Sequence, residues 1–353
     1  MKIEKLRKEI DSIDSQVLDL LSRRGKEVLE IARLKSLSGK GCYVPEREKF
    51  ILERLLKKNR GPIPGDGLKA VYREILSSCR NLEAPLKIAY LGPEGSFTHL
   101  AAMEKLGSSM EFISSSDISE VFTAVEKNEV DLGVVPVENS SEGVVTYTLD
   151  ILVESPLKII DEIMLEITHY LVSRENDIIR IKKIYSHPQA LAQSRLWLRN
   201  NLSGVKIVEV DSTSEAARLS SMEKGTGAIT GKRAAEMYGL NILRAHIEDL
   251  AHNYTRFLVI GKEGVKPTGR DKTSIIFSVK DRSGALYHCL AVFAKANINL
   301  TKIESRPSRK KAWDYIFFID LEGHIDNPEV KRAFEQLEKI CVYLKVLGSY
   351  PRQ

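Results

Sequence analysis

The sequence predicts a multidomain protein of three parts: an all-α helical module at residues 1–84, a two-lobed α/β domain at 85–264 and a ferredoxin-like βαββαβ domain at 271–350. Three observations predict it. Apolar residues recur every three or four positions in the first segment. Short apolar runs alternate with helical patterns after Pro85, and a βαββαβ order follows Gly261. A chain of 353 residues has room for two or three cores.

The first segment reads as three helices. A stripe of alternating three- and four-residue spacing predicts a helix over about 3–37, and its members are Ile3, Leu6, Ile10, Ile13, Val17, Leu20, Ile31 and Leu34. The sequence SGKG at 38–41 breaks it. Pro45 opens a second helix that ends near Lys58, because proline favours a first helical turn. After the breaker NRGPIPGDG, a third helix runs to Glu83.

The middle segment alternates strand and helix patterns, which predicts mostly parallel sheets. Its strand candidates are Lys87–Leu91, Leu132–Val137, Lys183–Ser186, Lys206–Val210, Ala228–Thr230 and Arg256–Ile260. About 175 residues are many for one sheet, so we expect two lobes. Gly261–Asp271 reads as a linker.

The last segment repeats a strand–helix–strand pattern. Its predicted elements are the strand Ser274–Val279, the helix Gly284–Ala296, the strands Ile298–Ser305 and Trp313–Leu321, the helix Pro328–Ile340 and the strand Tyr343–Gly348. This order is that of the ferredoxin-like arrangement.

Composition excludes several classes of protein. Hydrophobic residues make up 43% and charged residues 29%, as in soluble globular chains. The apolar runs are too short to cross a bilayer, and the charged N-terminus lacks the apolar region of a secretory signal. Four cysteines without CxxC spacing indicate neither a zinc site nor a disulfide framework, so we expect a cytoplasmic protein.

The first 83 residues carry an excess of positive charge, with 19 basic and 13 acidic residues. Such an excess favours an anionic partner, either nucleic acid or a small anionic substrate. Arg24 falls on the apolar stripe, where it either reaches solvent along its stem or binds an anion. Arg7 and Lys35 lie about 42 Å apart on one straight helix. A small-anion site that includes both therefore requires an antiparallel homodimer with shared sites.

Three stretches of this segment resemble the all-helical chorismate mutase family: LRKEIDSID, Arg23-Arg24 followed by Lys35, and YVPEREKFILERL. The resemblance implies a Claisen rearrangement of a dianion, in which cations clamp two carboxylates and donors act on the ether oxygen. It assigns the carboxylates to Arg24 and the partner chain's Arg7, and the ether oxygen to Lys35 and Glu83. Arg47 would support the site and Glu48 would bind the substrate hydroxyl. Some relatives have glutamine at Glu83, and a carboxyl donates a hydrogen bond only when protonated.

Polar residues cluster where strands of the α/β domain begin or end. The segments are YLGPEGSFTHLAA, VVPVENSSEG, YSHPQALAQS and HNYTRFLVIG. Each alone is compatible with capping and turn chemistry, although ligands of α/β sheets also bind at the carboxyl ends of strands. No serine sits in a GxSxG elbow, and the glycines of GTGAITG precede a strand, which excludes a nicotinamide loop.

Together these four segments resemble prephenate dehydratase. The family has two α/β lobes around a cleft, as in periplasmic binding proteins, and its reaction needs no metal or cofactor because aromatisation drives it. The resemblance makes Thr255 the donor to the leaving hydroxyl. It assigns substrate binding to Asn139, Ser186, Gln189 and Gln193, and it gives Arg256 the task of offsetting substrate charge.

The C-terminal segment resembles an ACT regulatory domain of the dehydratase type. Two motifs carry the resemblance and imply binding of L-phenylalanine: GAL (Gly284, Ala285, Leu286) and ESRP (Glu304, Ser305, Arg306, Pro307). A purely structural dimerisation module is the alternative. The basic run RPSRKK lacks the interleaved aromatic residues of an RNA-binding surface, so we expect no nucleic-acid partner.

The sequence therefore predicts a bifunctional enzyme that converts chorismate to prephenate and prephenate to phenylpyruvate, with feedback inhibition by L-phenylalanine. It predicts no cofactor, no metal, no membrane partner and a homodimer or higher homo-oligomer. Two alternatives remain open: a dehydratase that prefers arogenate, and a non-catalytic amino-acid sensor. Comparing turnover of prephenate and arogenate distinguishes the first alternative from a prephenate dehydratase.

Overall fold

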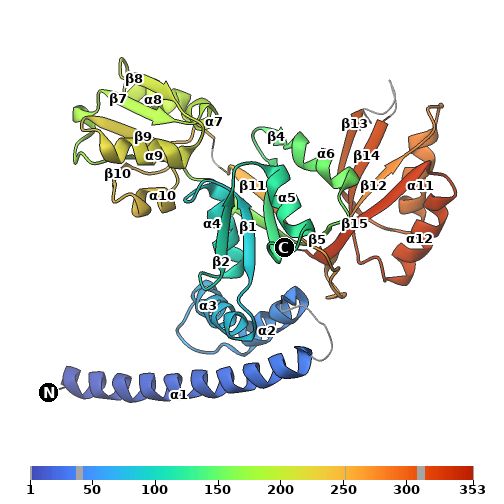
Figure 1. The fold of residues 1–353 in the computed structure, drawn as a ribbon, viewed down its shortest axis with the longest axis horizontal. Coiled ribbons are helices and arrows are strands. Elements are labelled where there is room, and N and C mark those ends of the chain that lie inside the picture. The colour runs from blue at the N-terminus through green and yellow to red at the C-terminus, as the bar shows by residue number, and fades with distance from the viewer. Residues whose placement is uncertain (1, 37–42, 251, 308–314, 353) are drawn as a thin grey trace. The chain divides into compact units, whose positions relative to one another are not determined.

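The computed structural model describes residues 2–36, 43–250, 252–307 and 315–352 (Figure 1). It contains two compact units. Unit 1 comprises residues 1–87 and 104–111, and unit 2 comprises residues 88–103 and 112–353. Among the described residues, no helix combines the length and apolar character that a bilayer crossing requires.

Unit 1 is built on the three predicted helices, α1 (Lys2–Ser36), α2 (Pro45–Lys58) and α3 (Gly65–Glu83). Pro45 occupies the first turn of α2, as its fixed φ angle favours. Gly25 does not interrupt α1. It is buried, and a Cβ added there would lie 3.5 Å from a methyl carbon of Leu82 on α3, so the glycine allows α1 and α3 to approach closely.

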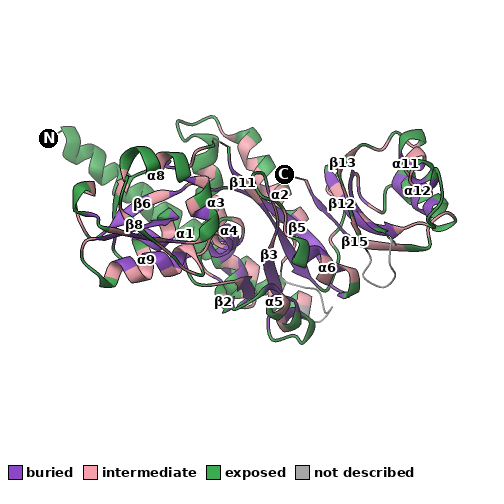
Figure 2. Ribbon diagram, turned by 90° about the horizontal axis from the view of Figure 1, so that it is seen from above, coloured by how far each residue is buried: buried purple, intermediate pink, exposed green. Residues whose placement is uncertain are grey.

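The apolar stripe of α1 is exposed within a single chain (Figure 2). Six of its side chains leave about half or more of their surface in contact with solvent: Ile3, Leu6, Ile10, Ile13, Val17 and Leu20. Exposed contiguous apolar surface of this kind marks an interaction site.

Unit 2 begins with lobe 1, a sheet with the strand order β2-β1-β3-β11-β5 in which β4 pairs with β3. Its strands are β1 (Lys87–Leu91), β2 (Glu111–Ser115), β3 (Leu132–Asn139), β4 (Gly143–Val144), β5 (Lys158–Glu166) and β11 (Tyr254–Gly261), and its helices are α4 (Phe97–Leu106), α5 (Ile118–Glu126) and α6 (Thr146–Glu154). Strand β11 runs antiparallel to both of its neighbours, β3 and β5.

Lobe 2 is a second sheet with the order β10-β6-β9-β7-β8. Its strands are β6 (Tyr170–Ser173), β7 (Lys183–Ser186), β8 (Lys206–Glu209), β9 (Thr226–Thr230) and β10 (Asn241–Arg244). The connecting helices are η1 (Ile178–Arg180), α7 (Pro188–Gln193), α8 (Arg195–Asn201), α9 (Thr213–Met222) and α10 (Lys232–Met237).

The chain crosses between the lobes twice, once after β5 and once before β11. The two crossing segments are hydrogen-bonded to each other. The N–H of Ile167 donates to the carbonyl of Asn253 at 2.7 Å, and the N–H of Ile247 donates to the carbonyl of His169 at 3.2 Å. The crossings therefore form one joined connection between the lobes.

The sheets of lobe 1 and lobe 2 are both mixed, so the prediction of mostly parallel sheets is wrong. In lobe 2, β7 pairs in parallel with β8 and β9, whereas β6 is antiparallel to β9 and β10. The sequence analysis missed β5 because its sequence KIIDEIMLE places Asp161 and Glu162 inside a strand. Both acidic residues are buried, and the cations that pair with Glu162, namely Arg256 and Lys272, lie far away in the sequence.

The C-terminal module confirms the βαββαβ order. It consists of β12 (Asp271–Ser278), α11 (Ala285–Lys295), β13 (Leu300–Pro307), β14 (Tyr315–Glu322), α12 (Pro328–Glu338) and β15 (Tyr343–Pro351), with the sheet order β13-β14-β12-β15. The predicted strand start at Trp313 lies outside the described residues.

Lobe 1 and the C-terminal module share one hydrophobic core. Val137, Leu149 and Leu258 of lobe 1 belong to the same buried cluster as residues of β12, β14 and β15, namely Ile276, Phe318, Leu347 and Tyr350. The strands that hold this cluster appear in the buried colour in Figure 2. Gly348 lets the two parts meet, because a Cβ added there would lie 2.8 Å from the backbone nitrogen of Ile159.

We expect Gly348→Ala to destabilise unit 2 by about 1–3 kcal/mol, the usual cost of overpacking. The added methyl group would force β15 away from the backbone of β5. Gly264→Ala is the matched control, because no atom lies within 4 Å of the Cβ position there. Urea unfolding of the two variants measures the difference, and equal midpoints would contradict the tight contact.

Candidate functional sites

Unit 1 encloses a cavity of about 320 Å³ between its three helices. The polar side chains that line it are Arg24 and Lys35 from α1, Arg47 and Glu48 from α2, and Cys79, Arg80 and Glu83 from α3. Four cations therefore face two carboxylates, and this surplus of positive charge suits an anionic ligand. The cavity brings together five of the six residues that the sequence predicted for this site.

Close contacts hold these side chains. Lys35 Nζ donates to Glu83 Oε1 at 2.6 Å, so the two predicted ether-oxygen donors face each other. Arg24 donates to the sulfur of Cys79. In this state Glu83 accepts a hydrogen bond from Lys35, so a donor role for Glu83 requires a proton on the carboxyl.

Arg80 was missed by the sequence analysis. It is 6% exposed, it forms an ion pair with Glu48 at 3.2 Å, and its guanidinium lies over the ring of Tyr43. It follows Leu76 by four positions and so lies on the apolar stripe of α3, which is a signal that the sequence did contain.

Arg7 lies outside this cavity. It is exposed, and α1 is one continuous helix, so Arg7 lies about 42 Å along the axis from Lys35. Its predicted role depends entirely on a second chain.

In unit 2, Asn139 and Thr255 are directly opposite each other on β3 and β11. Asn139 Oδ1 accepts from the backbone N–H groups of Ser141 at 2.9 Å and Glu142 at 3.0 Å. Because these partners are backbone donors, they fix which end of the amide carries oxygen. Asn139 Nδ2 therefore donates, to Asn253 Oδ1 at 2.8 Å and to Thr255 Oγ1 at 2.9 Å.

Further hydrogen bonds with an assigned donor and acceptor extend from Asn253 into lobe 2. Asn253 Nδ2 donates to Gln193 Oε1 at 3.0 Å, and His169 Nε2 lies 2.8 Å from the same oxygen. Thr255 is thus an acceptor toward Asn139, and no described residue accepts its hydroxyl proton. Gln193 keeps its NH₂ group available, with one weak contact to Glu142 at 3.4 Å.

His169 and Asn253 were not predicted as site residues. Both are almost fully buried, and they lie in the two segments that cross between the lobes. The pKa of His169 lies below its usual value, because the effect of burial outweighs the hydrogen bond to Gln193 and the charge of Glu248, which both raise it. The neutral imidazole then carries its proton on Nε2, where it can donate to Gln193.

Two predicted substrate-binding residues lie in lobe 2. Ser186 is fully buried, and its hydroxyl donates to the carbonyl of Ile229 at 2.9 Å. Its single proton is therefore committed to β9 while its oxygen can still accept, and its role in substrate binding stays a prediction. Gln189 is exposed in the first turn of α7, and its role stays a prediction.

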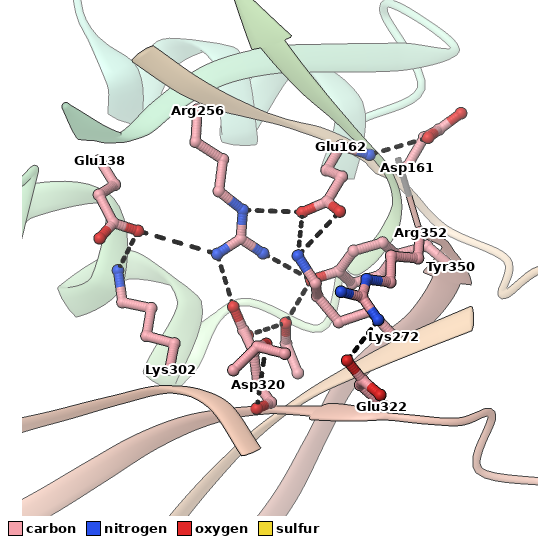
Figure 3. Close-up of polar contacts among 12 residues, drawn as sticks. Glu138, Asp161, Glu162, Arg256, Lys272, Lys302, Asp320, Glu322, Tyr350 and Arg352 are labelled. Atoms are coloured by element: carbon pink, nitrogen blue, oxygen red, sulfur yellow. Dashed lines mark hydrogen bonds and ion pairs between the residues drawn. The ribbon is translucent and has the colours of Figure 1, made fainter. Parts of the chain in front are cut away.

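The surroundings of Arg256 differ from those predicted. The residue is 8% exposed, and its guanidinium donates to Glu162, Asp320 and Tyr350 (Figure 3). Burial alone lowers the pKa of Arg256, but Tyr350, Asp320 and Glu162 raise it well above its usual value. Since Arg256 is already neutralised by protein carboxylates, we correct its predicted task of offsetting substrate charge.

The two predicted effector motifs lie on different elements of the C-terminal module. Gly284 precedes α11 with φ +76°, a conformation that favours glycine, and Ala285 and Leu286 begin the helix. Glu304, Ser305 and Pro307 lie on the edge strand β13. Arg306, on the same strand, forms an ion pair with Asp150 of α6 at 3.1 Å, so this motif also contacts lobe 1.

Comparisons with known proteins match all three parts. The family models for chorismate mutase type II, prephenate dehydratase and the ACT domain match residues 6–84, 88–265 and 273–339. The prephenate dehydratase of Arthrobacter aurescens, solved in complex with L-Phe, has a TM-score of 0.70 and 35% identity, covering 76% of this chain and 90% of that one. The quorum-quenching acylase GqqA has a TM-score of 0.69 and 28% identity, covering 76% and 98%.

These modules define an enzyme that joins two catalytic domains to an ACT domain on one chain. The bifunctional chorismate mutase/prephenate dehydratase of Aquifex aeolicus is 50% identical over 99% of this chain and 98% of its own length. The chain belongs to the family of bifunctional chorismate mutase/prephenate dehydratases.

We expect Asn253→Asp to lower dehydratase kcat/KM at least tenfold. A carboxylate cannot donate to Gln193, and it adds a buried negative charge beside the candidate site for an anionic substrate. Asn200→Asp on the exposed face of α8 is the matched control. Thermal unfolding of unit 2 in the same samples reports on folding. A variant with unchanged dehydratase kinetics would show that the network around Asn253 has no part in the reaction.

Proposed function

We propose that the unit 1 cavity performs the rearrangement of chorismate to prephenate. Its surplus of cations carries this assignment, because the reaction needs a dianion to be held in a compact conformation while charge develops on the ether oxygen. Arg24 clamps a carboxylate, Lys35 and a protonated Glu83 act on the ether oxygen, and Glu48 binds the hydroxyl. Arg47 and Arg80 keep the electrostatic potential in the cavity positive.

The mutase site is completed by a second chain in a homodimer. The exposed apolar stripe of α1 supports this, because burying it in an antiparallel pair removes a large apolar surface from water. The same pairing brings Arg7 of one chain toward the cavity of the other. Neither feature is satisfied by one chain alone.

In unit 2 we assign the dehydratase reaction to the cleft side of the Asn139–Thr255 pair. Prephenate loses CO₂ and its ring hydroxyl while the ring becomes aromatic. The direction of the hydrogen bonds carries the assignment: Asn139 donates to Thr255, which leaves the Thr255 O–H to donate to the departing hydroxyl. The NH₂ group of Gln193 is a second donor, directed at a carboxylate of the substrate.

L-phenylalanine is the proposed effector of the ACT domain, and prephenate rather than arogenate is the proposed substrate. The phenylalanine complex of the Arthrobacter relative and the dehydratase names of the relatives support these choices. Cys289 and Cys341 remain free thiols with their sulfurs 3.9 Å apart, which fits a reducing cytoplasm.

Thr255→Ala should lower dehydratase kcat by about 100- to 1000-fold, because a transition-state donor is lost. Thr255→Ser keeps the hydroxyl and should retain most of the activity. Chorismate mutase activity should be unchanged in both variants, since that site lies in unit 1. Dehydratase activity of Thr255→Ala within twofold of wild type would remove Thr255 from the mechanism.

Arg7→Ala and Arg24→Ala should each abolish mutase activity in a homodimer of the variant. Random mixing of the two variants should restore about a quarter of wild-type activity, because half of the dimers then carry one intact site of two. Mutase assays before and after subunit exchange measure this. Absence of recovery in verified mixed dimers would contradict a shared site.

L-phenylalanine should inhibit the dehydratase of the full chain, and Glu304→Ala should weaken that inhibition while leaving kcat within about twofold. Point variants suit this test better than deletion of residues 270–353, because the deletion would expose the core that lobe 1 shares with the ACT domain. Unchanged inhibition of Glu304→Ala would place the effector site elsewhere.

A further inference from the structure

Two adjacent residue pairs of the β3–β11 ladder have different surroundings. Thr255 pairs with Asn139, and the next pair is Arg256 with Glu138. Successive side chains of a strand point to opposite faces of the sheet. The first pair therefore belongs to the hydrogen-bond network with Asn253 and Gln193, whereas the second belongs to the network that Figure 3 draws between lobe 1 and the ACT domain.

All three guanidinium nitrogens of Arg256 are held. Nε donates to Glu162 of β5 at 2.8 Å, Nη1 to Asp320 of β14 at 2.5 Å, and Nη2 to the Tyr350 hydroxyl of β15 at 2.8 Å. The ACT domain thus supplies two of the three partners and orients the guanidinium.

Glu138 is held in the same way. Lys302 of β13 donates to Glu138 Oε2 at 2.6 Å, and Arg256 Nη1 lies 3.9 Å from the same oxygen. Lys272 of β12 completes the network through Glu162. Three cations face three carboxylates, and every strand of the ACT sheet contributes at least one member.

This arrangement connects the ACT domain directly to the reacting side chains. Arg256 and Glu138 are covalent neighbours of Thr255 and Asn139, so a displacement of the former pair moves the backbone that carries the latter. The Asn139–Thr255 hydrogen bond of 2.9 Å depends on that backbone. Small errors in the placement of a donor are costly in a reaction that relies on orientation.

We propose that Lys302 and Asp320, two residues of the ACT domain, are positioning residues for the dehydratase reaction. They hold the Glu138–Arg256 pair and through it the Asn139–Thr255 pair. This inference rests on the proposed role of Thr255. The alternative is that the network only holds the ACT domain against lobe 1. In that case substitutions in it change stability alone.

Lys302→Gln in the full chain tests the proposal, with Lys302→Arg as the charge-conserving variant and Lys331→Gln on the exposed face of α12 as the matched control. We expect Lys302→Gln to lower dehydratase kcat on the order of tenfold, with KM changed less than kcat. The arginine variant should recover most of kcat, and mutase activity should stay constant. An unchanged kcat in Lys302→Gln would overturn the proposal.

Asp320→Asn is the second variant, because it removes the negative charge that pairs with Arg256. It should lower dehydratase kcat in protein whose thermal unfolding and mutase activity are retained. If this variant fails to fold, the result for Lys302 decides, since Lys302 and Glu138 are partly accessible to solvent.

A double-variant cycle shows whether Lys302 acts through Thr255. Combined with Thr255→Ser, Lys302→Gln should have a different effect on kcat than it has alone, because coupled residues are not additive. Additive effects would contradict the route through Thr255. The two proposals fail separately: an active Thr255→Ala overturns the role of Thr255, whereas an inactive Thr255→Ala with an unaffected Lys302→Gln overturns only the positioning role.

Discussion

The antiparallel pairing of β3 with β11 is the interaction on which the dehydratase half of the molecule depends. It joins residues 116 positions apart in the sequence and sets Asn139 directly against Thr255. The same ladder sets Glu138 against Arg256 on the other face. One pair of strands therefore carries both the hydrogen-bonded Asn139–Thr255 pair and the contact with the ACT domain. The core that these strands share with the ACT sheet keeps the two faces in a fixed relation.

The mutase half depends on helix packing rather than on strand pairing. Its cavity needs no long strand ladder, since three helices suffice to gather Arg24, Lys35 and Glu83 around about 320 Å³. Within one chain the apolar stripe of α1 is exposed, and Arg7 does not line the cavity. The proposed antiparallel pairing of two α1 helices would cover this stripe and bring Arg7 of one chain toward the cavity of the other, and it would thereby link association to catalysis in this unit.

The sequence predicted what depends on local pattern. The helices of unit 1 and the βαββαβ order follow from periodicity and from breakers such as Pro45. Asn139, Gln193 and Thr255 were found because they lie in motifs at strand ends, and the structure joins them in one network. The strand β5 was missed because buried Asp161 and Glu162 contradict an apolar pattern. The setting of Arg256 was missed because its partners Glu162, Asp320 and Tyr350 lie 64 to 94 residues away. Asn253 lies in the segment HNYTRFLVIG but was given no role, and His169 gave no local signal, since the contacts of both arise only where two crossings meet.

Hydrogen–deuterium exchange of the full chain with and without L-phenylalanine tests most directly whether the β3–β11 ladder connects the ACT domain to the cleft. Our account predicts altered protection in residues 284–307 and also in residues 136–142 and 252–258, which hold the two ladder pairs. A change confined to the ACT domain, with both ladder segments unaffected at saturating phenylalanine, would contradict it.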